Sequence, residues 1–409
     1  MKKKPVSLET YIVLGFFILV FVVFSYEMGL ANFLGTAIDT GYYLLINIAF
    51  WIMGVAVLTG AAAGVFSEFG IVALFNVILG PIVRLIYRLP GVAGIGAVSA
   101  YLSDNPAVIS LYKEKEFRKR FKDYQIPVLV NLGTSFGMGL VIAITFISLQ
   151  QDYAEVGNFF LAVGLGVIAS IIGSIVSVRM LTYYAKKHYN VPKNDNPIKK
   201  IEGDEFLRET REGTFINRLL ESALDGGKNG VDIGLQIIPG ILIISTFIIM
   251  ITNQPPIGGF TGSALEGIGY LPKIGQHLMF IFKPLFGFTS PEAIAFPLTS
   301  LGSAGAAVGF VEEFLNQGYI GIKDIAVFTA IGTTWSGYLS THVGMMDALH
   351  SRPLTTKAII AHTIGGLVSG VAANYLFIFV GFITPYAITL FNFLGTYLQD
   401  IWNFIINLF

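Results

Sequence analysis

Cysteine is absent from all 409 residues of the chain. Its absence excludes disulfides, thiolate metal sites and iron–sulfur ligation within this chain. A phosphate-binding Walker loop, a zinc-protease motif, a nucleophile elbow and a dinucleotide fingerprint are absent as well. Because no nucleophile–base pair is visible either, we expect no enzyme, no organic cofactor and no metal centre. If the protein drives an energy-requiring process, the energy must come from an ion gradient, because no nucleotide-binding motif is present.

Charge is scarce too. Charged residues make up 13% of the chain, with 26 basic and 26 acidic side chains. The net charge of zero points to no particular partner, and we expect no nucleic acid. Hydrophobic residues, in contrast, reach 54%, and the mean hydropathy is +0.69. One soluble core cannot bury so much apolar surface. We therefore expect an integral membrane protein whose surroundings are the lipid bilayer.

Long uncharged runs predict an all-α polytopic fold. A spanning helix needs roughly 20 mostly apolar residues, and the short alternating segments of a membrane barrel are missing. About eight transmembrane helices are expected, at roughly 10–26, 43–65, 126–149, 158–180, 233–252, 325–346, 358–380 and 386–408. The last two are separated because Gly381 and Pro385 interrupt one apolar run.

The amino terminus begins with Lys2, Lys3 and Lys4 ahead of the first apolar run. This pattern also opens a signal peptide, but Glu27 stands where a small-residue cleavage site belongs, so we expect a retained span. Lysine and arginine remain on the cytoplasmic side of a membrane. Both termini are therefore expected in the cytoplasm, and the protein in the cytoplasmic membrane.

One motif is written twice in the chain. Leu102–Ala107 is loosely echoed 199 positions later by Leu301–Ala306, and Gly133–Phe136 is echoed at the same offset by Gly332–Trp335. Because both pairs of motifs are separated by the same offset, chance similarity is a poor explanation for them. The segment 113–123, after the first copy, holds six basic and three acidic residues. After the second copy come Glu312, Glu313, Lys323 and Asp324, which sum to a negative charge. Opposite flanking charge predicts copies that face opposite sides of the bilayer, as in inverted-repeat transporters.

Two apolar stretches are too short or too interrupted to cross the bilayer. We expect re-entrant hairpins of opposite orientation, at about 89–112 and 276–311, whose non-helical tips must face protein or water. Residues 182–230 form the only long polar stretch and predict a cytoplasmic linker, with 210–223 either an amphipathic helix or a solvated tether. The expected organisation is a first span with an outer loop at 1–42, a first repeat at 43–181, the linker at 182–230, a second repeat at 231–380 and a last span at 381–409.

At these motifs the chain resembles the nucleoside-recognition, or Gate, domain family. The resemblance rests on Leu89-Pro90-Gly91, on Ser103 to Ala107, on Gly133 to Ser135 and on their second copies. Relatives in that family include concentrative nucleoside transporters, spore-maturation membrane proteins and the membrane part of bacterial ferrous-iron transporters. In the nucleoside transporters, two hairpins of opposite entry each pack against a broken helix, with solute and cation bound between the tips. The resemblance implies a similar fold here.

Asp104 is the only carboxylate in the first expected hairpin, and a charge at membrane depth is costly and usually functional or paired. With Ser103 it offers oxygen ligands for Na⁺, or a carboxyl group for a proton. Asn131 and Thr134 of the following helix are candidate ligands of the same cation. The alternatives are a helix cap at Asp104 and ordinary interhelical hydrogen bonds for the other two.

Solute binding is assigned to neutral polar residues of both halves. The candidates are Asn105, Ser135, Ser300, Ser303, Thr333 and Thr334. The second hairpin has no equivalent of Asp104, so the first half should supply the charge of a cation site. His342, His350 and His362 lie eight and twelve positions apart, which favours core or interface histidines over a metal cluster.

Two functions remain open. The first is a secondary active transporter of a small polar solute, nucleoside-like by resemblance, coupled to Na⁺ or H⁺ through an elevator or gating motion. The second is a non-transporting membrane partner or regulatory protein of the spore-maturation type. A homo-oligomer is compatible with either function.

Overall fold

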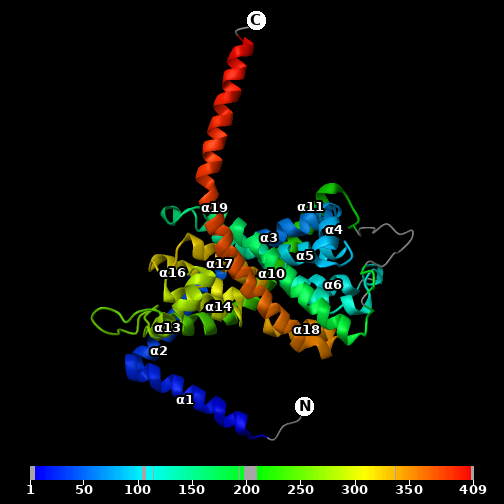
Figure 1. Cartoon of the computed structure of the whole chain (residues 1–409). Coiled ribbons are helices and arrows are strands. Elements are labelled where there is room, and N and C mark those ends of the chain that lie inside the picture. The colour runs from blue at the N-terminus through cyan, green and yellow to red at the C-terminus, as the bar shows by residue number, and fades with distance from the viewer. Residues whose placement is uncertain are drawn as a thin grey trace.

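Helices form every regular element in the part of the chain that the structure describes. The computed structural model describes residues 5–103, 107–113, 115–192, 194–197, 210–336 and 338–406, and no strand occurs within these ranges. The hydrocarbon core of a membrane offers no hydrogen-bond partners to the backbone. A helix is stable there because its backbone N–H and C=O groups bond to one another. Figure 1 shows long helices that cross the molecule obliquely, with shorter helices packed between them. The all-α fold predicted from the sequence is confirmed.

The first half runs from α1 to α10. Its helices are α1 (Leu8–Met28), α2 (Leu30–Tyr43), η1 (Leu44–Ala49), α3 (Phe50–Glu68), α4 (Ile71–Tyr87), α5 (Ala93–Leu102), α6 (Ala107–Lys113), α7 (Lys115–Arg118), η2 (Asp123–Gln125), α8 (Val128–Thr134), α9 (Gly139–Ser148), η3 (Ala154–Val156) and α10 (Phe159–His188).

The second half repeats this order. Its helices are α11 (Phe215–Gly240), η4 (Ile241–Ser245), α12 (Thr246–Thr252), α13 (Tyr270–Phe286), η5 (Pro291–Ile294), α14 (Ala295–Ser300), α15 (Ala304–Val308), α16 (Val311–Asn316), α17 (Ile322–Thr334), α18 (Leu339–Ala348), η6 (Arg352–Leu354) and α19 (Thr355–Ile406). Both ends of α13 lie 199 positions beyond the ends of α4, the same offset that relates the motifs. The two helices lie at opposite corners of the molecule (Figure 1).

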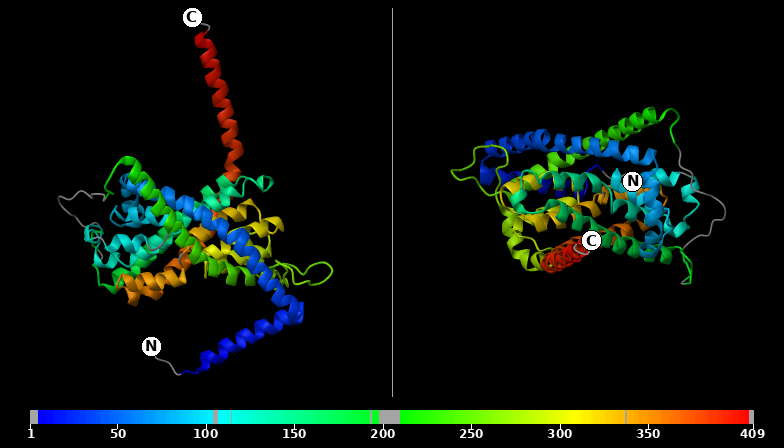
Figure 2. Two further views of the ribbon diagram at one scale, coloured as in Figure 1. Left: turned by 180° about the vertical axis from the view of Figure 1, so that it is seen from behind. Right: turned by 90° about the horizontal axis from the view of Figure 1, so that it is seen from above.

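Two continuous helical segments form a scaffold. The segment α2–η1–α3 packs along α11–η4–α12, with α3 against α11 and α2 against α12, so the two run antiparallel. Figure 2 shows the first of them running diagonally across the back of the molecule. Each contains a π-helical turn, η1 or η4, and the two turns contact each other.

Glycines allow the scaffold helices to approach closely. A Cβ on Gly226 of α11 would overlap the carbonyl oxygen of Gly60, and a Cβ on Gly64 of α3 would overlap that of Ser222. Small residues at such crossings replace side-chain contacts by backbone contacts, as in many membrane helix pairs. The tight pairing of α3 with α11 follows from these residues.

Each half also contains a broken helix. α8 ends at Thr134 and α9 begins at Gly139, with Met138 between them in a left-handed conformation (φ 54°). α17 ends at Thr334 and α18 begins at Leu339. The sequence predicted uninterrupted spans at 126–149 and 325–346. Both are interrupted near their centres, as the family resemblance implied.

Six helical segments in the described part of the chain are long and apolar enough to cross a membrane, compared with eight expected spans. The expected spans at 325–346 and 386–408 are not among these six, the last of which ends at Thr384. Helix α19 continues past Gly381 and Pro385 as one helix of 52 residues. The division of α19 expected at Gly381 and Pro385 is absent.

The polar linker is shorter than predicted. Helix α11 begins at Phe215 and enters its packing with α3 before residue 230, although it carries Asp225 and Lys228. The small residues among these charges, which contact α3, explain why the segment is helical rather than a tether. Of the alternatives for 210–223, a helix is present from residue 215 onward.

Short helix pairs occupy the positions of the two expected hairpins. α5 packs against α6 on either side of residues 103–106, and α14 packs against α15 on either side of residues 301–303. The second pair is preceded by α13, a separate helix that the predicted range of 276–311 partly included. Re-entry into a bilayer remains a prediction for both pairs.

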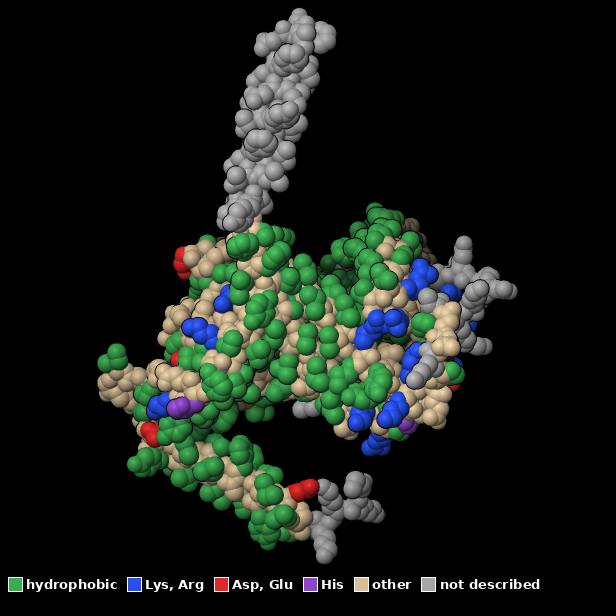
Figure 3. Space-filling model, in the orientation of Figure 1, with side chains coloured by type: hydrophobic (Ala, Val, Ile, Leu, Met, Phe, Trp, Pro, Cys, Tyr) green, Lys and Arg blue, Asp and Glu red, His purple; other side chains and the backbone are tan. Residues whose placement is uncertain are grey.

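Charge separates the two ends of the helix bundle. At one end Lys186 lies over the ring of Tyr124, and Lys357 lies over the ring of Tyr184. At the other end Glu312 is close to Asp152. Most Lys and Arg side chains visible in Figure 3 lie at the first end, which carries α6 and α18. We refer to it below as the basic end.

Candidate functional site

The two broken helices meet at their breaks. The hydroxyl of Ser336, just after α17, donates to the carbonyl oxygen of Thr134 at the end of α8, at 3.3 Å. A Cβ on Gly139, the first residue of α9, would lie 3.2 Å from Cγ2 of Thr333. Residues 133–139, 332–336 and 338, which include both copies of the Gly-Thr motif, therefore form one contact region. We call it the crossing.

Four predicted solute or cation residues lie at the crossing and are fully buried: Thr134, Ser135, Thr333 and Thr334. Three of them bond to their own helix. Thr134 donates to Val130 O at 2.8 Å, Ser135 to Asn131 O at 2.7 Å and Thr334 to Ala330 O at 2.8 Å. Thr333 differs, because its hydroxyl oxygen is buried with no hydrogen-bond partner in the described part of the chain. Thr333 is thus the residue at the crossing whose hydroxyl is available to a ligand.

The second hairpin touches the crossing through α15. A Cβ on Gly305 would lie 3.8 Å from Cε of Met138. Ser303 accepts a hydrogen bond from the amide of Ala306 at 3.1 Å and so caps α15. The hydroxyl of Ser300 is buried and, within the described ranges, has no hydrogen-bond partner. Of the two serines in this hairpin that were assigned to solute, Ser303 therefore caps a helix, and the hydroxyl of Ser300 is available.

The first hairpin touches the crossing through α5. A Cβ on Gly139 would overlap the ring of Tyr101, so only glycine fits beside that side chain. Ser103 follows α5 and donates to Ser99 O at 2.8 Å. Asp104 and Asn105, the charge and the amide predicted for the tip, lie outside the described residues.

Asn131 lies one helical turn before the crossing, within a buried polar network. Its amide nitrogen donates to Ser177 Oγ at 2.9 Å and to Ala358 O at 3.0 Å. Its amide oxygen lies 3.2 Å from Nε2 of His342. Both polar atoms of its side chain thus have protein partners. This agrees with the alternative considered for Asn131, ordinary hydrogen bonding between helices. Its role in binding a cation remains a prediction.

Two of the three histidines come together. His342 of α18 and His362 of α19 are both fully buried, with ring centroids 4.5 Å apart. Ser177 Oγ lies 3.1 Å from Nδ1 of His362. His350 is exposed. Within the described residues, no group of three or more His, Cys, Asp or Glu side chains could hold a metal ion. The sequence spacing did not reveal this pair, because its two helices meet only in the tertiary fold.

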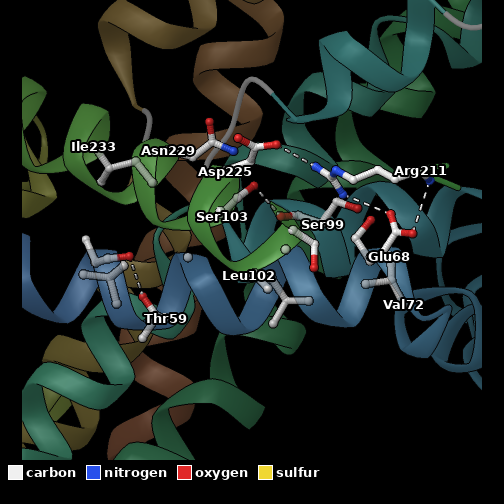
Figure 4. Close-up of a pocket in the computed structure, with 18 residues that line it drawn as sticks. Thr59, Glu68, Val72, Ser99, Leu102, Ser103, Arg211, Asp225, Asn229 and Ile233 are labelled. Carbon is white, nitrogen blue, oxygen red and sulfur yellow. Dashed lines mark hydrogen bonds and ion pairs between the residues drawn. The ribbon is translucent and has the colours of Figure 1, made fainter. Parts of the chain in front are cut away.

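A cavity of about 340 Å³ lies beside Glu68. Its walls come mainly from α3, α11 and the end of α5, and Val141 of α9 also lines it. Figure 4 shows Ser99 and Ser103 on one side of this cavity and Arg211 between Glu68 and Asp225 on another. The cavity therefore lies between the end of α5 and the scaffold.

Glu68 anchors the ionic cluster at this cavity. It accepts hydrogen bonds from Nη1 of Arg211 at 2.9 Å and from Nε of Arg218 at 2.7 Å. Arg211 also bonds Asp225 at 3.0 Å. Glu68 was not among the functional residues predicted from the sequence. A lone carboxylate at the end of the apolar run 43–67 was the available signal.

Comparison with known proteins identifies the fold only. No protein-family profile and no curated protein sequence matches the chain. Among solved structures, a doubly substituted variant of CNTnw in an outward-facing state is 14% identical, covers 90% of this chain and 86% of that chain, and has a TM-score of 0.50. CNTnw in an inward-facing substrate-bound state is 15% identical, with the same coverages and a TM-score of 0.48. CNTnw is a concentrative nucleoside transporter. The predicted likeness to that fold is confirmed, and membership of the Gate family stays a prediction.

Proposed function

We propose that this protein is a secondary active transporter of a small polar solute of the nucleoside class, driven by an inward gradient of Na⁺ or H⁺. The observation that supports this most directly is the crossing. Two broken helices from the two halves of a repeated fold meet there at their breaks, and each hairpin contributes a contact. Discontinuous helices at a repeat interface are the usual setting of substrate and ion sites in secondary transporters.

The solute site belongs at the crossing. Within the described residues, the buried hydroxyls of Thr333 and Ser300 have no protein partner. Ser135 and Thr334 belong to the two Gly-Thr motifs at the crossing. Buried polar groups without a partner are costly unless a ligand or water satisfies them. Asn105 and Ser303 complete the proposed set from the hairpin tips.

The coupling cation belongs at the first hairpin. Asp104 supplies the negative charge, with oxygen atoms from Ser103, Asn131 and Thr134 as the remaining candidates. A carboxylate with neutral oxygens can hold Na⁺, and a carboxyl group alone can carry a proton. The cation and the solute would then occupy neighbouring sites, so that binding one favours binding the other.

Alternating access follows from the division of the fold. The scaffold pair α3 and α11 is held together by backbone contacts at glycines, whereas the hairpins and broken helices meet through side chains and helix ends. We expect the latter to move against the former by an elevator or gating motion. In the inward-open state, the cavity beside Glu68 is the path from the crossing to the basic end, which we place in the cytoplasm with both termini.

Uptake into proteoliposomes tests the proposal. Purified protein is reconstituted, radiolabelled nucleosides are supplied outside, and gradients of Na⁺ and of pH are imposed separately. We expect gradient-dependent accumulation that Asp104→Asn abolishes. Accumulation that is unchanged when both gradients are removed would contradict secondary active transport.

The alternative is a non-transporting membrane partner. It is supported if a broad panel of nucleosides, bases and other small polar metabolites gives neither uptake nor thermal stabilisation, while affinity purification yields one stoichiometric membrane protein. If a solute binds but is not taken up, the proposed binding site would be supported and the proposed alternating-access motion would not.

A further inference from the structure

A second cavity, of about 410 Å³, lies between α4, α5 and α10 and is lined by apolar side chains. Its walls include Phe75 and Ile82 of α4 and Ala97 of α5. The hydroxyl of Tyr87, which also lines it, is already bonded to Ser174 Oγ at 2.6 Å. Water would find too few hydrogen-bond partners in such a space. The cavity is therefore suited to a hydrocarbon group.

The outer face of α4 connects this cavity with the bilayer. Its exposed apolar residues are Leu74, Phe75, Val77, Ile78, Ile82 and Leu85. They lie mostly three or four positions apart, so they share one helix face, and in a chain with six candidate membrane spans such a face lies against lipid. Phe75 and Ile82 belong both to this face and to the cavity wall. Acyl chains of the bilayer thus have direct access to the cavity.

Three arginines lie near the carboxyl end of α4, although none of them lines the cavity itself. Arg84 and Arg88 lie at the carboxyl end of α4, next in sequence to Val83 and Tyr87 of the cavity wall. Arg88 is close enough to Arg179 of α10 for the two positive charges to repel each other. In the described part of the chain, none of the three arginines forms an ion pair with a carboxylate. Uncompensated positive charge beside an apolar cavity is suited to a ligand with an anionic head and a hydrocarbon tail.

We propose that this cavity binds one anionic phospholipid. An acyl chain enters between α4 and α5, and the phosphate binds to Arg84, Arg88 and Arg179. The charge pattern favours phosphatidylglycerol over a zwitterionic lipid, because a phosphatidylcholine head brings its own cation to the arginines.

The lipid would act on the crossing. Phe136, in the break between α8 and α9, lines the cavity, and so does Tyr101, which packs against Gly139. A bound acyl chain therefore contacts the first hairpin and the first broken helix together. Its occupancy would hold these elements against α4 in the conformation of this structure.

Native mass spectrometry tests the site without any solute. The full-length protein is released from micelles that contain phosphatidylglycerol and phosphatidylcholine of identical acyl chains, and retained lipid is counted. We expect one phosphatidylglycerol per chain. The double variant Arg84→Gln/Arg88→Gln should bind it about thirtyfold more weakly, from the usual contribution of juxtamembrane basic residues. The matched control is Lys273→Gln/Lys283→Gln, two exposed lysines of α13 at the other end, and should not change retention.

Two further experiments distinguish binding of the lipid's anionic head group from binding of its acyl chain. Ala97→Leu narrows the cavity and should lower retention while the arginines remain, and its thermal unfolding profile shows whether the fold is kept. Soluble glycerol phosphate at millimolar concentration should not displace the lipid. Equal retention of both lipids, equal retention by the arginine variant, or full displacement by glycerol phosphate would each overturn the proposal. Since transport is not measured, failure here is distinct from failure of the proposed function.

Discussion

The imidazole rings of His342 and His362 lie 4.5 Å apart, tilted by 45° and fully buried. They belong to α18 and α19, and Asn131 and Ser177 connect them to α8 and α10 by hydrogen bonds. Within the described residues His362 Nε2 has no hydrogen-bond partner, whereas Asn131 bonds both Ser177 and His342, and Ser177 also bonds His362. These bonds connect the second half of one broken helix to the first half of the other.

Asn131→Ala should destabilise the fold, because it removes the buried hydrogen bonds of Asn131 to Ala358 O, Ser177 Oγ and His342 Nε2. A buried group without its partner costs about 1–3 kcal/mol, so a loss of several kcal/mol is expected in thermal or denaturant unfolding in micelles. Asn47→Ala is the matched control, since Asn47 is exposed and bonds only Tyr43 O within its own helix. Its effect should stay within about 0.5 kcal/mol. Equal effects of the two substitutions would contradict the structural role of the network.

Thr333→Val should lower solute uptake with little loss of stability. The hydroxyl of Thr333 has no protein partner in the described part of the chain, so valine keeps the shape and removes only a group available to the solute. We expect about a tenfold rise in the solute KM, the usual consequence of one lost hydrogen bond. Thr329→Val is the control, because Thr329 is outside the proposed solute site and its buried hydroxyl is bonded to Ile325 O. The two variants are compared by KM in proteoliposomes, and an equal or larger effect at Thr329 would contradict the assignment.

Gly226→Val should separate the scaffold helices. A Cβ at Gly226 would overlap the carbonyl oxygen of Gly60, and backbone cannot move aside as a side chain can. Overpacking costs typically about 1–3 kcal/mol, measured as a lower unfolding temperature. The neighbouring Gly227→Ala is the control, since its Cβ would lie 3.6 Å from Val57 Cγ1, an ordinary contact. Alanine is also the better helix former, so this variant should be neutral or slightly more stable.

Acid should release the segment that follows α10. The ammonium of Lys122 donates to Asp195 at 2.5 Å, and this bond holds the pKa of Asp195 below its ordinary value despite partial burial. Because the folded-state pKa is the lower one, the contribution to stability is complete above the unfolded value of about 3.9 and is lost as the pH falls through the folded value. Hydrogen exchange of residues 190–196 should therefore be constant from neutral pH to about 5 once the intrinsic rate is corrected, and rise below 4. Asp195→Asn should show the faster exchange already at neutral pH. If the variant and the unaltered protein exchange at the same rate, the bond between Lys122 and Asp195 does not hold this segment in place.

The repeat was predictable because it leaves marks along the sequence. The offset of 199 between the motifs recurs in the ends of α4 and α13, and the short apolar stretches near residues 100 and 300 do form helix pairs. The breaks at 135–138 and 335–338 were not visible as local patterns. Their apolar surroundings are typical of uninterrupted spans, and only the family resemblance implied broken helices.

Other features depend on partners distant in the chain. The start of α11 reads as a polar linker because of Asp225 and Lys228, but Gly226 and Ser222 pack against α3 and make it part of the scaffold. The pairing of His342 with His362 depends on how α18 docks on α19. The spacing of residues along the sequence carries no information on contacts between distant helices. The candidate residues could therefore be predicted, but the side chains that surround them in the fold could not.

The two π-helical turns, η1 and η4, touch each other in the middle of the scaffold. A π-turn holds one residue more than the α-helical register allows, and a single inserted amino acid is the simplest way to make one. Since both halves carry the turn at nearly equivalent positions, the economical history is one insertion in an ancestral half-length gene, before its duplication. That gene product would then have paired with a second copy of itself, π-turn against π-turn, as a symmetric dimer.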